Sequence, residues 1–533
     1  MAPVGSPRRS RTPVAVARSD TVCGYILLAS RAYNFLASRA YNLLASRAPP
    51  LAGSGSPSPS VAVSAAAAGF PKWVLLEPFV FRRDDDDSFP DETKAPIRAS
   101  GLTSWGARFS IAFSVAEPPL ISHLYAQLPV PGFPGPHEAG PPLAILATHG
   151  HLVLLRVATH TPKLHLFQDL FIYSAHENPC LLKILPPCNE PAFADGQFLG
   201  RPTTPRLLNT ASLGLWCRGN EEFVVAELSL HRPRCHFMIF ADICLLRSCT
   251  SSASHNRRCD GRWKSMRVEI LSTDDPDDND LRQLTFWQTE TVVPFRKWLC
   301  WIDYNRGILF CNMMSKVSTP TVSFLKFPLD KFPLTSTRIA TGNCWYRGVS
   351  VVDHGRDLKF VNVARQDGIF FKALERGTGF TITCHTLVGM VWKKDYTVTS
   401  DELWDANTSD RLPRGILMFP RVDIDRPHVV HFLYIEFGHV NKNMWVVAID
   451  MSTKTVESLS VYIDRKDSCI DMPCIKTLED LARFQRHNIR TIRDLIGQKS
   501  MSPMPFLPCE FPKFLSRKRT ESTSAVRSLN AQK

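Results

Sequence analysis

The sequence contains no run of about 18 consecutive apolar residues, which is the length that a helix needs to cross a bilayer. It also lacks the dense, regularly spaced cysteines of a secreted disulfide scaffold, because its 15 cysteines are spread over 533 residues. We therefore expect no membrane-spanning helix, a reducing compartment and mostly buried thiols.

Acidic residues are scarce at both ends of the chain. Residues 1–70 hold seven arginines and one acid, and residues 482–533 hold eleven lysines and arginines and three acids. These ends carry +6 and +8 of a net charge of +13, so the residues between them carry about −1. A strongly basic balance is typical of nucleic-acid-binding proteins, but here it does not belong to the body. Nucleic-acid binding by the folded body is therefore not expected.

Patterns of phosphate and calcium binding are also missing. Neither common type of Gly-rich phosphate loop occurs. Asp275, Asp277 and Asn279 alternate as the first ligands of a calcium loop do. However, Asp280 and Phe286 occupy the positions that require Gly and Glu. This segment is more simply a solvated acidic loop.

Ser and His offer two further candidates for chemistry. Residues 101–106, which include Ser104, are one residue too long at the front for the turn of a nucleophile elbow. His149 and His151 would face one side of a strand, as some pairs of metal ligands do. No third ligand is evident, which favours a hairpin turn before a strand at residues 152–157.

Four cysteines form the remaining candidate for a metal site: Cys235, Cys244, Cys249 and Cys259. Only Cys244 and Cys249 have a spacing that is usual in zinc sites. Buried strand thiols explain the group better, although metal binding by residues 235–259 stays open. The sequence therefore assigns no catalytic, cofactor-binding or metal-binding residue, and no cofactor is expected.

Residues 1–70 are rich in Arg, Ser, Ala and Pro, and they contain an eight-residue sequence that is repeated three times over residues 27–50. This composition cannot build a core, so we expect a disordered arm. It is also typical of a transit peptide. An idle extension and a secretory signal are the alternatives. A transit peptide would direct the protein to the chloroplast or mitochondrion; otherwise an intracellular protein of the cytoplasm or nucleus is expected.

Residues 71–465 consist of short apolar or alternating segments separated by turn residues. Examples such as residues 223–230, 321–327 and 428–435 have the length of strands and are rich in β-branched and aromatic residues. This pattern predicts an all-β domain.

A recurring phrase in this domain joins an apolar strand, an Asp, a polar turn and a second apolar strand. It occurs at Asp303, Asp353 and Asp450, with a looser copy at Asp395. Each copy is expected to be a hairpin whose Asp satisfies backbone groups of the turn. Their mean spacing is near 49 residues, the length of one four-stranded propeller blade. We therefore expect a β-propeller-like repeat of short antiparallel hairpins with six to eight units; a set of β-sandwiches is the alternative.

The C-terminal part of the chain differs from this domain. Apolar residues recur at helical spacing over residues 478–496, which predicts a helical segment at residues 466–500. Residues 501–533, with their basic run at 517–519, are expected to form a disordered basic tail.

Six phrases occur in order at residues 73–77, 109–119, 121–123, 298–311, 427–432 and 445–450. Together these phrases resemble the plant family catalogued as domain of unknown function 1618. No catalytic residues are established for that family, so the resemblance implies none. The later hairpins also look like the propeller regions that follow F-boxes in plant ubiquitin-ligase adaptors, but residues 1–72 contain no F-box.

These observations favour a non-enzymatic scaffold that binds a protein partner. The alternatives are a hydrolase or oxidase on the same architecture and a ubiquitin-ligase substrate adaptor without a recognisable F-box. An enzyme should show a cluster of acids or histidines in a central channel, whereas a binding protein should show an exposed apolar or aromatic patch. The identity of the partner and the oligomeric state stay open.

Overall fold

The structure is a computed structural model that divides the chain into two compact units. One comprises residues 1–58 and 134–141, and the other residues 59–133 and 142–533. All described residues belong to the second unit, so the expected arm up to residue 69 and the expected helix at residues 466–500 lie outside them. The structure describes residues 70–515 apart from residues 85, 134–141, 161–165, 177–181, 191–192, 195–196, 199–204, 220–221, 233–238, 249–260, 273–283, 315–319, 330–344, 368–372, 409–411, 413, 436–443 and 463–505.

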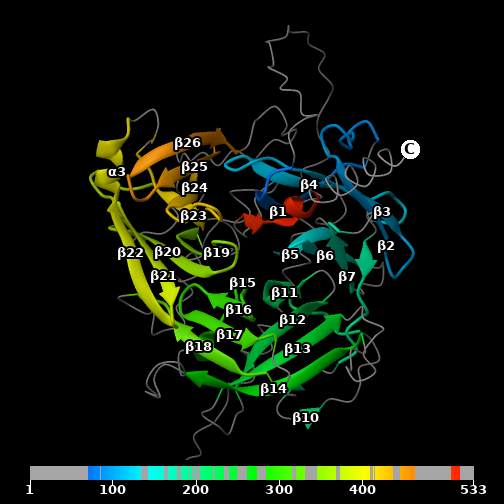
Figure 1. Ribbon diagram of the computed structural model, residues 1–533. Coiled ribbons are helices and arrows are strands. Elements are labelled where there is room, and N and C mark those ends of the chain that lie inside the picture. Colours follow the sequence, from blue (N-terminus) through cyan, green and yellow to red (C-terminus); the bar gives the residue numbers. More distant parts are fainter. Residues whose placement is uncertain are drawn as a thin grey trace, which may run out of the picture. The chain divides into compact units, whose positions relative to one another are not determined.

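The described part of the chain is an all-β structure, as the sequence predicts. Its strands fall into six groups of four that follow one another along the chain, as the colours of Figure 1 show. The first three groups are β1 (Val74–Arg82), β2 (Ile97–Leu102), β3 (Arg108–Ser114) and β4 (Ile121–Gln127); β5 (Leu143–His149), β6 (Leu152–His160), β7 (Leu166–Ser174) and β8 (Lys183–Ile184); and β11 (Leu213–Arg218), β12 (Glu222–His231), β13 (Phe240–Ser248) and β14 (Trp263–Ser272).

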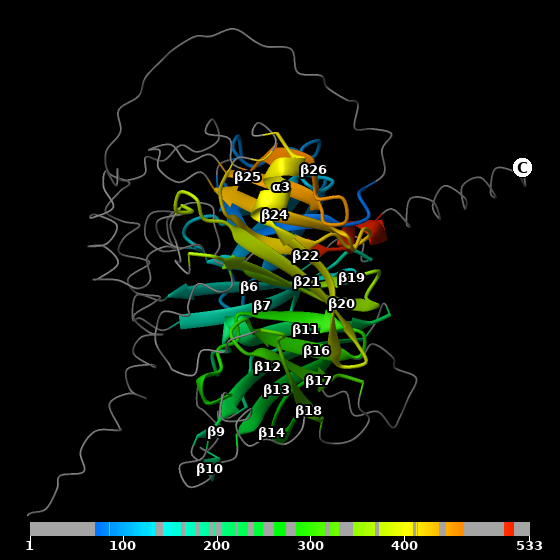
Figure 2. The same cartoon turned by 90° about the vertical axis from the view of Figure 1, so that its left-hand side faces the viewer.

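The other three groups follow the same plan, and Figure 2 shows the last two side by side. They are β15 (Thr291–Phe295), β16 (Trp298–Asp303), β17 (Gly307–Asn312) and β18 (Val322–Lys326); β19 (Arg347–Val352), β20 (Asp357–Arg365), β21 (Phe380–Val388) and β22 (Val391–Thr399); and β23 (Leu417–Val422), β24 (Val429–Ile435), β25 (Met444–Asp450) and β26 (Thr455–Val461).

In all groups but the first, strands that are neighbours in the chain are also antiparallel neighbours in the sheet. In the first group the order is β2-β3-β4-β1, and β1 runs parallel to β4. The third and fourth groups join through a parallel pairing of β14 with β18, which makes one eight-stranded sheet.

The first strands of successive groups contact one another in order: β1 with β5, β5 with β11, β11 with β15, β15 with β19 and β19 with β23. The last group contacts the first, because the rings of His431 in β24 and Trp73 before β1 lie 5.8 Å apart. This closed succession of six four-stranded groups is compatible with a propeller. The pairing of β14 with β18 departs from one, since propeller blades are separate sheets.

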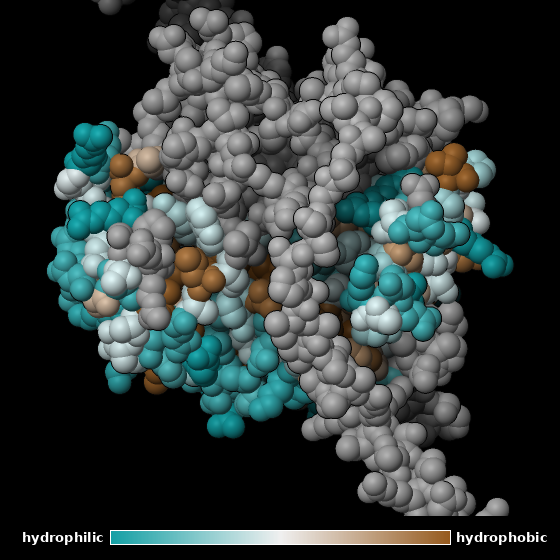
Figure 3. Space-filling view, turned by 90° about the horizontal axis from the view of Figure 1, so that it is seen from above, coloured by the Kyte–Doolittle hydropathy of each residue, from teal (hydrophilic) through white to brown (hydrophobic). Residues whose placement is uncertain are grey.

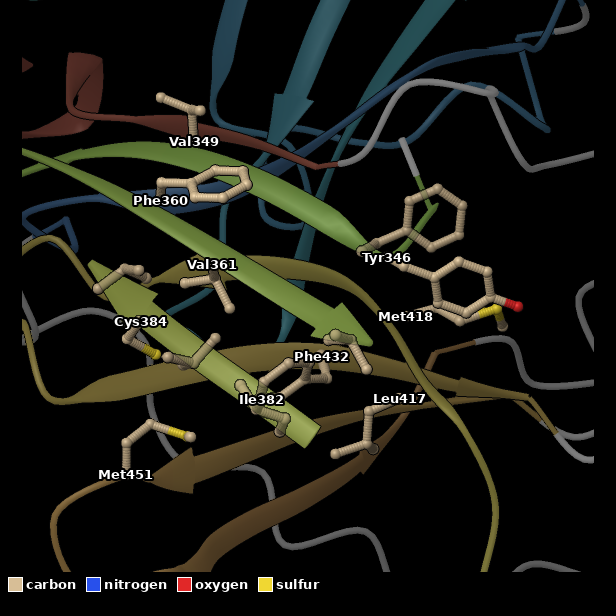
Figure 4. Packing of buried hydrophobic residues seen from close by; sticks show 14 of the residues in the cluster. Tyr346, Val349, Phe360, Val361, Ile382, Cys384, Leu417, Met418, Phe432 and Met451 are labelled. Carbon is tan, nitrogen blue, oxygen red and sulfur yellow. The ribbon is translucent and has the colours of Figure 1, made fainter. Parts of the chain in front are cut away.

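The largest hydrophobic core contains the side chains between the fifth and sixth groups. Figure 4 shows Val361, Ile382 and Cys384 of one group facing Leu417 and Phe432 of the other. The exposed fraction of each of these side chains is 3% or less. Alternation of apolar side chains along a strand places them on this inner face.

A glycine allows these two groups to approach closely. A Cβ atom at Gly348 in β19 would lie 2.0 Å from the carbonyl oxygen of Pro420 in β23. No side chain fits at that distance, so glycine is required there.

The Asp phrases meet the expectation of hairpins in three cases. Asp303 ends β16, Asp353 follows β19 and Asp450 ends β25, each at a turn. The prediction of a hairpin at the looser copy is wrong, because Asp395 lies inside the single strand β22. Its side chain accepts a hydrogen bond from Lys359 Nζ at 2.8 Å.

The spacing of these Asp residues is not the period of the fold. The three hairpins join different strands of their groups, namely the second to the third, the first to the second, and the third to the fourth. The second to sixth groups begin at residues 143, 213, 291, 347 and 417, which is 56 to 78 residues apart. The number of groups, six, nevertheless falls within the predicted range.

The expected tail at residues 501–533 contains an ordered part. Residues 507–509 form β27 (Leu507–Cys509), which pairs antiparallel with β1, and residues 511–515 are helical. Phe506, Cys509 and Phe511 are buried. The expectation of a disordered tail is therefore wrong for residues 506–515, because their apolar side chains complete the core beside β1.

Smaller elements complete the described structure. Thr399 and Glu402 form a capping box at the start of a short helix between β22 and β23. No helix within the described ranges is long and apolar enough to span a membrane. The smaller elements are β9 (Phe193–Ala194), β10 (Gln197–Phe198), η1 (Thr210–Ser212), η2 (Leu284–Phe286) and α3 (Ser400–Ala406).

Candidate functional site

His149 ends β5 and His151 lies on the tight turn before β6, at the hairpin that the sequence predicts. His149 Nδ1 accepts a hydrogen bond from the backbone N–H of Cys217 at 2.7 Å. Burial, together with the nearby His151, lowers the pKa of His149 to about 4. The His151 ring lies 4.5 Å from that of His176 and 5.7 Å from that of Phe514. The two histidines therefore join the turn to different neighbours.

Of the four candidate cysteines, the structure describes Cys244. The other three, Cys235, Cys249 and Cys259, lie outside the described residues. Cys244 is in β13, and its Sγ lies 3.6 Å from Sγ of Cys188. Sequence reasoning missed Cys188, since the two residues are 56 positions apart and no local pattern connects them. Within the described ranges, no group of three or more His, Cys, Asp or Glu side chains is arranged to hold a metal ion.

Ser104 lies on the turn between β2 and β3 rather than on an elbow between a strand and a helix. Its backbone N–H donates to Asp169 Oδ2 in β7 at 2.6 Å. The candidate calcium loop at residues 274–280 lies outside the described residues.

A buried ionic cluster lies at the turn between β16 and β17. The Asp303 carboxylate accepts hydrogen bonds from the backbone N–H groups of Gln288 and Asn305, both at 2.9 Å, and from Arg306 Nη1 at 2.8 Å. Burial raises the pKa of Asp303, while Arg306 and the backbone donors oppose that shift. Burial also lowers the pKa of the nearby Arg347 to about 10. Asp303 has no exposed surface, so this cluster stabilises the turn and is closed to a substrate.

A second buried pair joins Asp423, which follows β23, to His431 in β24. His431 Nε2 lies 3.3 Å from Asp423 Oδ2. Burial opposes ionisation of Asp423, but the hydrogen bond with His431 and the charge of Arg426 outweigh it and lower the pKa. An Asp–His pair is a common part of catalytic triads. Here His431 is 1% exposed and covered by the Trp73 ring, so a substrate cannot reach it.

Trp105 links segments of the first two groups of strands that carry exposed apolar residues. We define the aromatic patch as Leu102, Trp105, Val130 and Phe167. Leu102, Val130 and Phe167 are 52%, 62% and 43% exposed. The ring of Trp105 lies 6.1 Å from that of Phe167, and its Nε1–H donates to the carbonyl oxygen of Gly132 in the turn that carries Val130. Trp105 thus connects the β2–β3 turn, the turn after β4 and strand β7.

Other exposed apolar residues are more scattered. On the face seen in Figure 3, hydrophobic side chains form small separate brown areas within a mainly hydrophilic surface. Elsewhere, Val388 and Val391 form a small exposed apolar pair at the turn between β21 and β22. Single exposed apolar residues are normal on a protein surface, whereas a cluster around a Trp indicates an interaction site.

Comparisons with known proteins assign no activity. Residues 301–431 match the family model described as "Protein of unknown function (DUF1618)", which confirms the resemblance over those residues. This segment runs from β16 to β24 and contains both buried ionic groups. No curated protein matches the chain.

Similar solved structures share little with this chain. They include an ulvan lyase of polysaccharide lyase family 25, with 8% identity and a TM-score of 0.20 over 70% of this chain and 64% of the lyase. They also include PorZ, a surface component of the type-IX secretion system of Porphyromonas gingivalis. It has 7% identity and a TM-score of 0.12 over 74% of this chain and 60% of PorZ. Each match thus covers less than two thirds of the solved protein's own chain. Neither similarity carries an argument about fold or activity.

Proposed function

We propose that this chain, whose residues 301–431 match the domain of unknown function 1618, is a non-enzymatic scaffold that binds a protein partner through the aromatic patch. The observation that carries the proposal is that Trp105 contacts the exposed Phe167 ring and the turn that carries the exposed Val130. Leu102, which is also more than 40% exposed, lies three positions before Trp105 in the chain. A partner that covers these side chains removes apolar surface from water, which favours association.

The aromatic patch is held in place before a partner arrives. The hydrogen bond from the Ser104 N–H to Asp169 fixes the β2–β3 turn to β7, and the bond from Trp105 to Gly132 fixes it to the turn after β4. Underneath, Phe133 is 2% exposed, and its ring packs 6.2 Å from that of Trp105. A fixed Trp loses little conformational entropy on binding, which is one reason why Trp is frequent among residues that dominate binding energy.

Acidic side chains, Asp84 and Asp86, lie on the side of the aromatic patch next to the end of β4. Basic side chains lie on the side next to the β2–β3 hairpin, and these indicate the chemistry of the partner there. Arg108 is exposed and pairs directly opposite Leu102 across the β2–β3 hairpin. Lys183 is exposed and follows Leu182, whose N–H donates to the carbonyl oxygen of Ser100 in β2. Basic side chains at the edge of an apolar surface favour acidic partners and exclude basic ones. We therefore infer a partner segment with apolar side chains flanked by Asp or Glu.

A peptide array tests this inference. Full-length protein is applied to peptides in which Leu, Phe and Pro are flanked by Asp or Glu, and to the same peptides with Lys in place of the acids. We expect binding to the acidic set, with at least tenfold weaker binding by the double variant Leu102→Asp, Val130→Asp, because like charge and lost apolar area both oppose association. Arg108→Glu should shift binding toward the basic set.

The matched control is Val388→Asp, Val391→Asp, which changes two equally exposed valines at the β21–β22 turn. This variant should bind the acidic peptides as the unaltered protein does. Equal binding of the acidic and basic sets, or equal loss in both double variants, would rule out the aromatic patch as the binding surface. All five substituted positions are exposed, so the variants are expected to fold.

A further inference from the structure

Two buried thiols from different parts of the chain lie next to each other where the segment that follows β8 meets β13. Cys188 lies on that segment and Cys244 lies in β13 of the next group of strands. Their Sγ atoms are 3.6 Å apart, and the residues are 4% and 2% exposed. At this separation no atom fits between the two sulfurs.

The segment that carries Cys188 is tied to the third group of strands on both sides of the thiol. Trp263 Nε1–H in β14 donates to the carbonyl oxygen of Pro186 at 2.8 Å, and the N–H of Ser265 donates to Glu190 Oε2 at 3.1 Å. The carbonyl oxygen of Cys188 itself accepts the N–H of Arg206 at 2.7 Å. These bonds hold the backbone of Cys188 over β13, so its thiol faces Cys244 as part of the fold.

We propose that Cys188 and Cys244 are a modification site that forms an intramolecular disulfide when the protein meets a low-molecular-weight disulfide. A disulfide has a sulfur–sulfur distance of about 2.05 Å, so the two sulfurs must approach by about 1.5 Å. Rotation of the Cys188 side chain on its connecting segment can provide much of that movement, whereas Cys244 is fixed within a strand.

The reaction balances with one small disulfide as the oxidant. Cys188 loses its proton and attacks one sulfur of the small disulfide, which releases one small thiolate and leaves a mixed disulfide on Cys188. Cys244 then loses its proton and attacks Cys188 Sγ, which releases the second small thiolate. Two protein thiols are oxidised, one small disulfide is reduced to two thiols, and two electrons are transferred.

The surroundings of the two cysteines indicate which thiol attacks the small disulfide first. The hydrogen bond between the two thiols lowers the pKa of Cys188 and raises that of Cys244, and the positive charge of Arg206 favours the Cys188 thiolate as well. Cys188 is also easier to reach, because a connecting segment can open locally without unfolding a sheet. Cys188 is therefore the attacking thiol and Cys244 the resolving thiol.

Oxidation of the intact protein tests the proposal. Full-length protein is incubated at graded ratios of oxidised to reduced glutathione, alkylated under denaturing, non-reducing conditions and mapped by peptide mass spectrometry. We expect one cross-linked peptide pair that contains Cys188 and Cys244, with a mass lower by about 2 Da than the two reduced peptides together. The product should appear with native protein and become far less abundant when the protein is oxidised in denaturant.

Single substitutions separate the roles of the two thiols. Cys244→Ser should leave a stable glutathione adduct on Cys188, whereas Cys188→Ser should leave Cys244 unmodified. The matched control is Cys384→Ser, which removes another buried strand thiol and should not change the yield of the cross-link. Full alkylation of both cysteines after oxidation of the native protein would overturn the proposal, as would linkage of Cys188 to a different cysteine.

Discussion

The His149 imidazole makes the stability of this protein depend on pH. The pKa of His149 is about 4 in the folded protein and about 6.5 in the unfolded chain, so between these values the unfolded state binds more protons. The free energy of unfolding therefore falls as the pH is lowered from 6.5 to 4, and the contribution of His149 to this loss is at most about 3 kcal/mol.

The substitution His149→Asn isolates this effect. The amide oxygen of Asn can accept the N–H of Cys217 in place of Nδ1 but does not titrate. Denaturant unfolding at several pH values should show that the variant loses less stability than the unaltered protein between pH 6.5 and pH 4. Parallel pH curves for the two proteins would contradict the lowered pKa.

Turn residues were predictable wherever the partner of the side chain is local. Asp450 accepts hydrogen bonds from the backbone of Ser452 and Thr453, two and three positions later, which is the expected behaviour of Asp in a turn. Asp395 is different, because its partners Lys359 and Thr386 come from β20 and β21. Only the folded sheet brings these residues together, so no local pattern distinguishes Asp395 from a turn residue.

Strand β27 and the short helix after it bring the C-terminal residues into the core of the first two groups. The Phe511 side chain has no exposed surface, and its ring packs 5.0 Å from that of Phe113 and 5.8 Å from that of Tyr173. Phe511→Ala should lower the free energy of unfolding by about 3–5 kcal/mol, because it removes buried apolar area and leaves a cavity. Chemical denaturation measures the change.

Phe514 provides the control for this prediction. It lies three residues later and is half-buried against His151 and His176. Phe514→Ala should therefore cost less than Phe511→Ala. An equal, small effect of both substitutions would mean that residues 506–515 add little to the stability of the fold.

Strands were easier to predict than the groups that they form. A segment such as residues 223–230 is recognisable from its own apolar and β-branched residues, and it lies within β12 as expected. The boundaries between groups depend on connections of very different length, so no regular period is visible. Strand β27 has only three residues and lies in a basic stretch, and its pairing partner is near the start of the body. The aromatic patch likewise contains residues from three separate stretches of the chain, so no local sequence pattern predicts it.

At the scale of the whole molecule, residues 1–58 belong to a compact unit other than the one that contains the described strands. Removal of residues 1–58 should therefore leave the melting temperature of the body unchanged. Removal of residues 1–73 should lower it clearly, because Trp73 is 6% exposed and packs against His431. Differential scanning calorimetry of the two shortened proteins makes the comparison. A clear drop for the shorter deletion would place the boundary of the body earlier in the chain.

The pairing of β1 with β27 also sets a time scale for synthesis. Val74 pairs with Cys509, which lies 435 positions later in the chain. At about 5–20 residues per second, a ribosome needs roughly 20–90 s to travel from one to the other. Throughout that interval the nascent chain presents an unpaired, strongly apolar strand edge, the kind of surface that draws chains into aggregates. Strand β1 therefore has to be shielded during translation, by chaperones or by temporary contacts within the growing chain, until its final partner has been made.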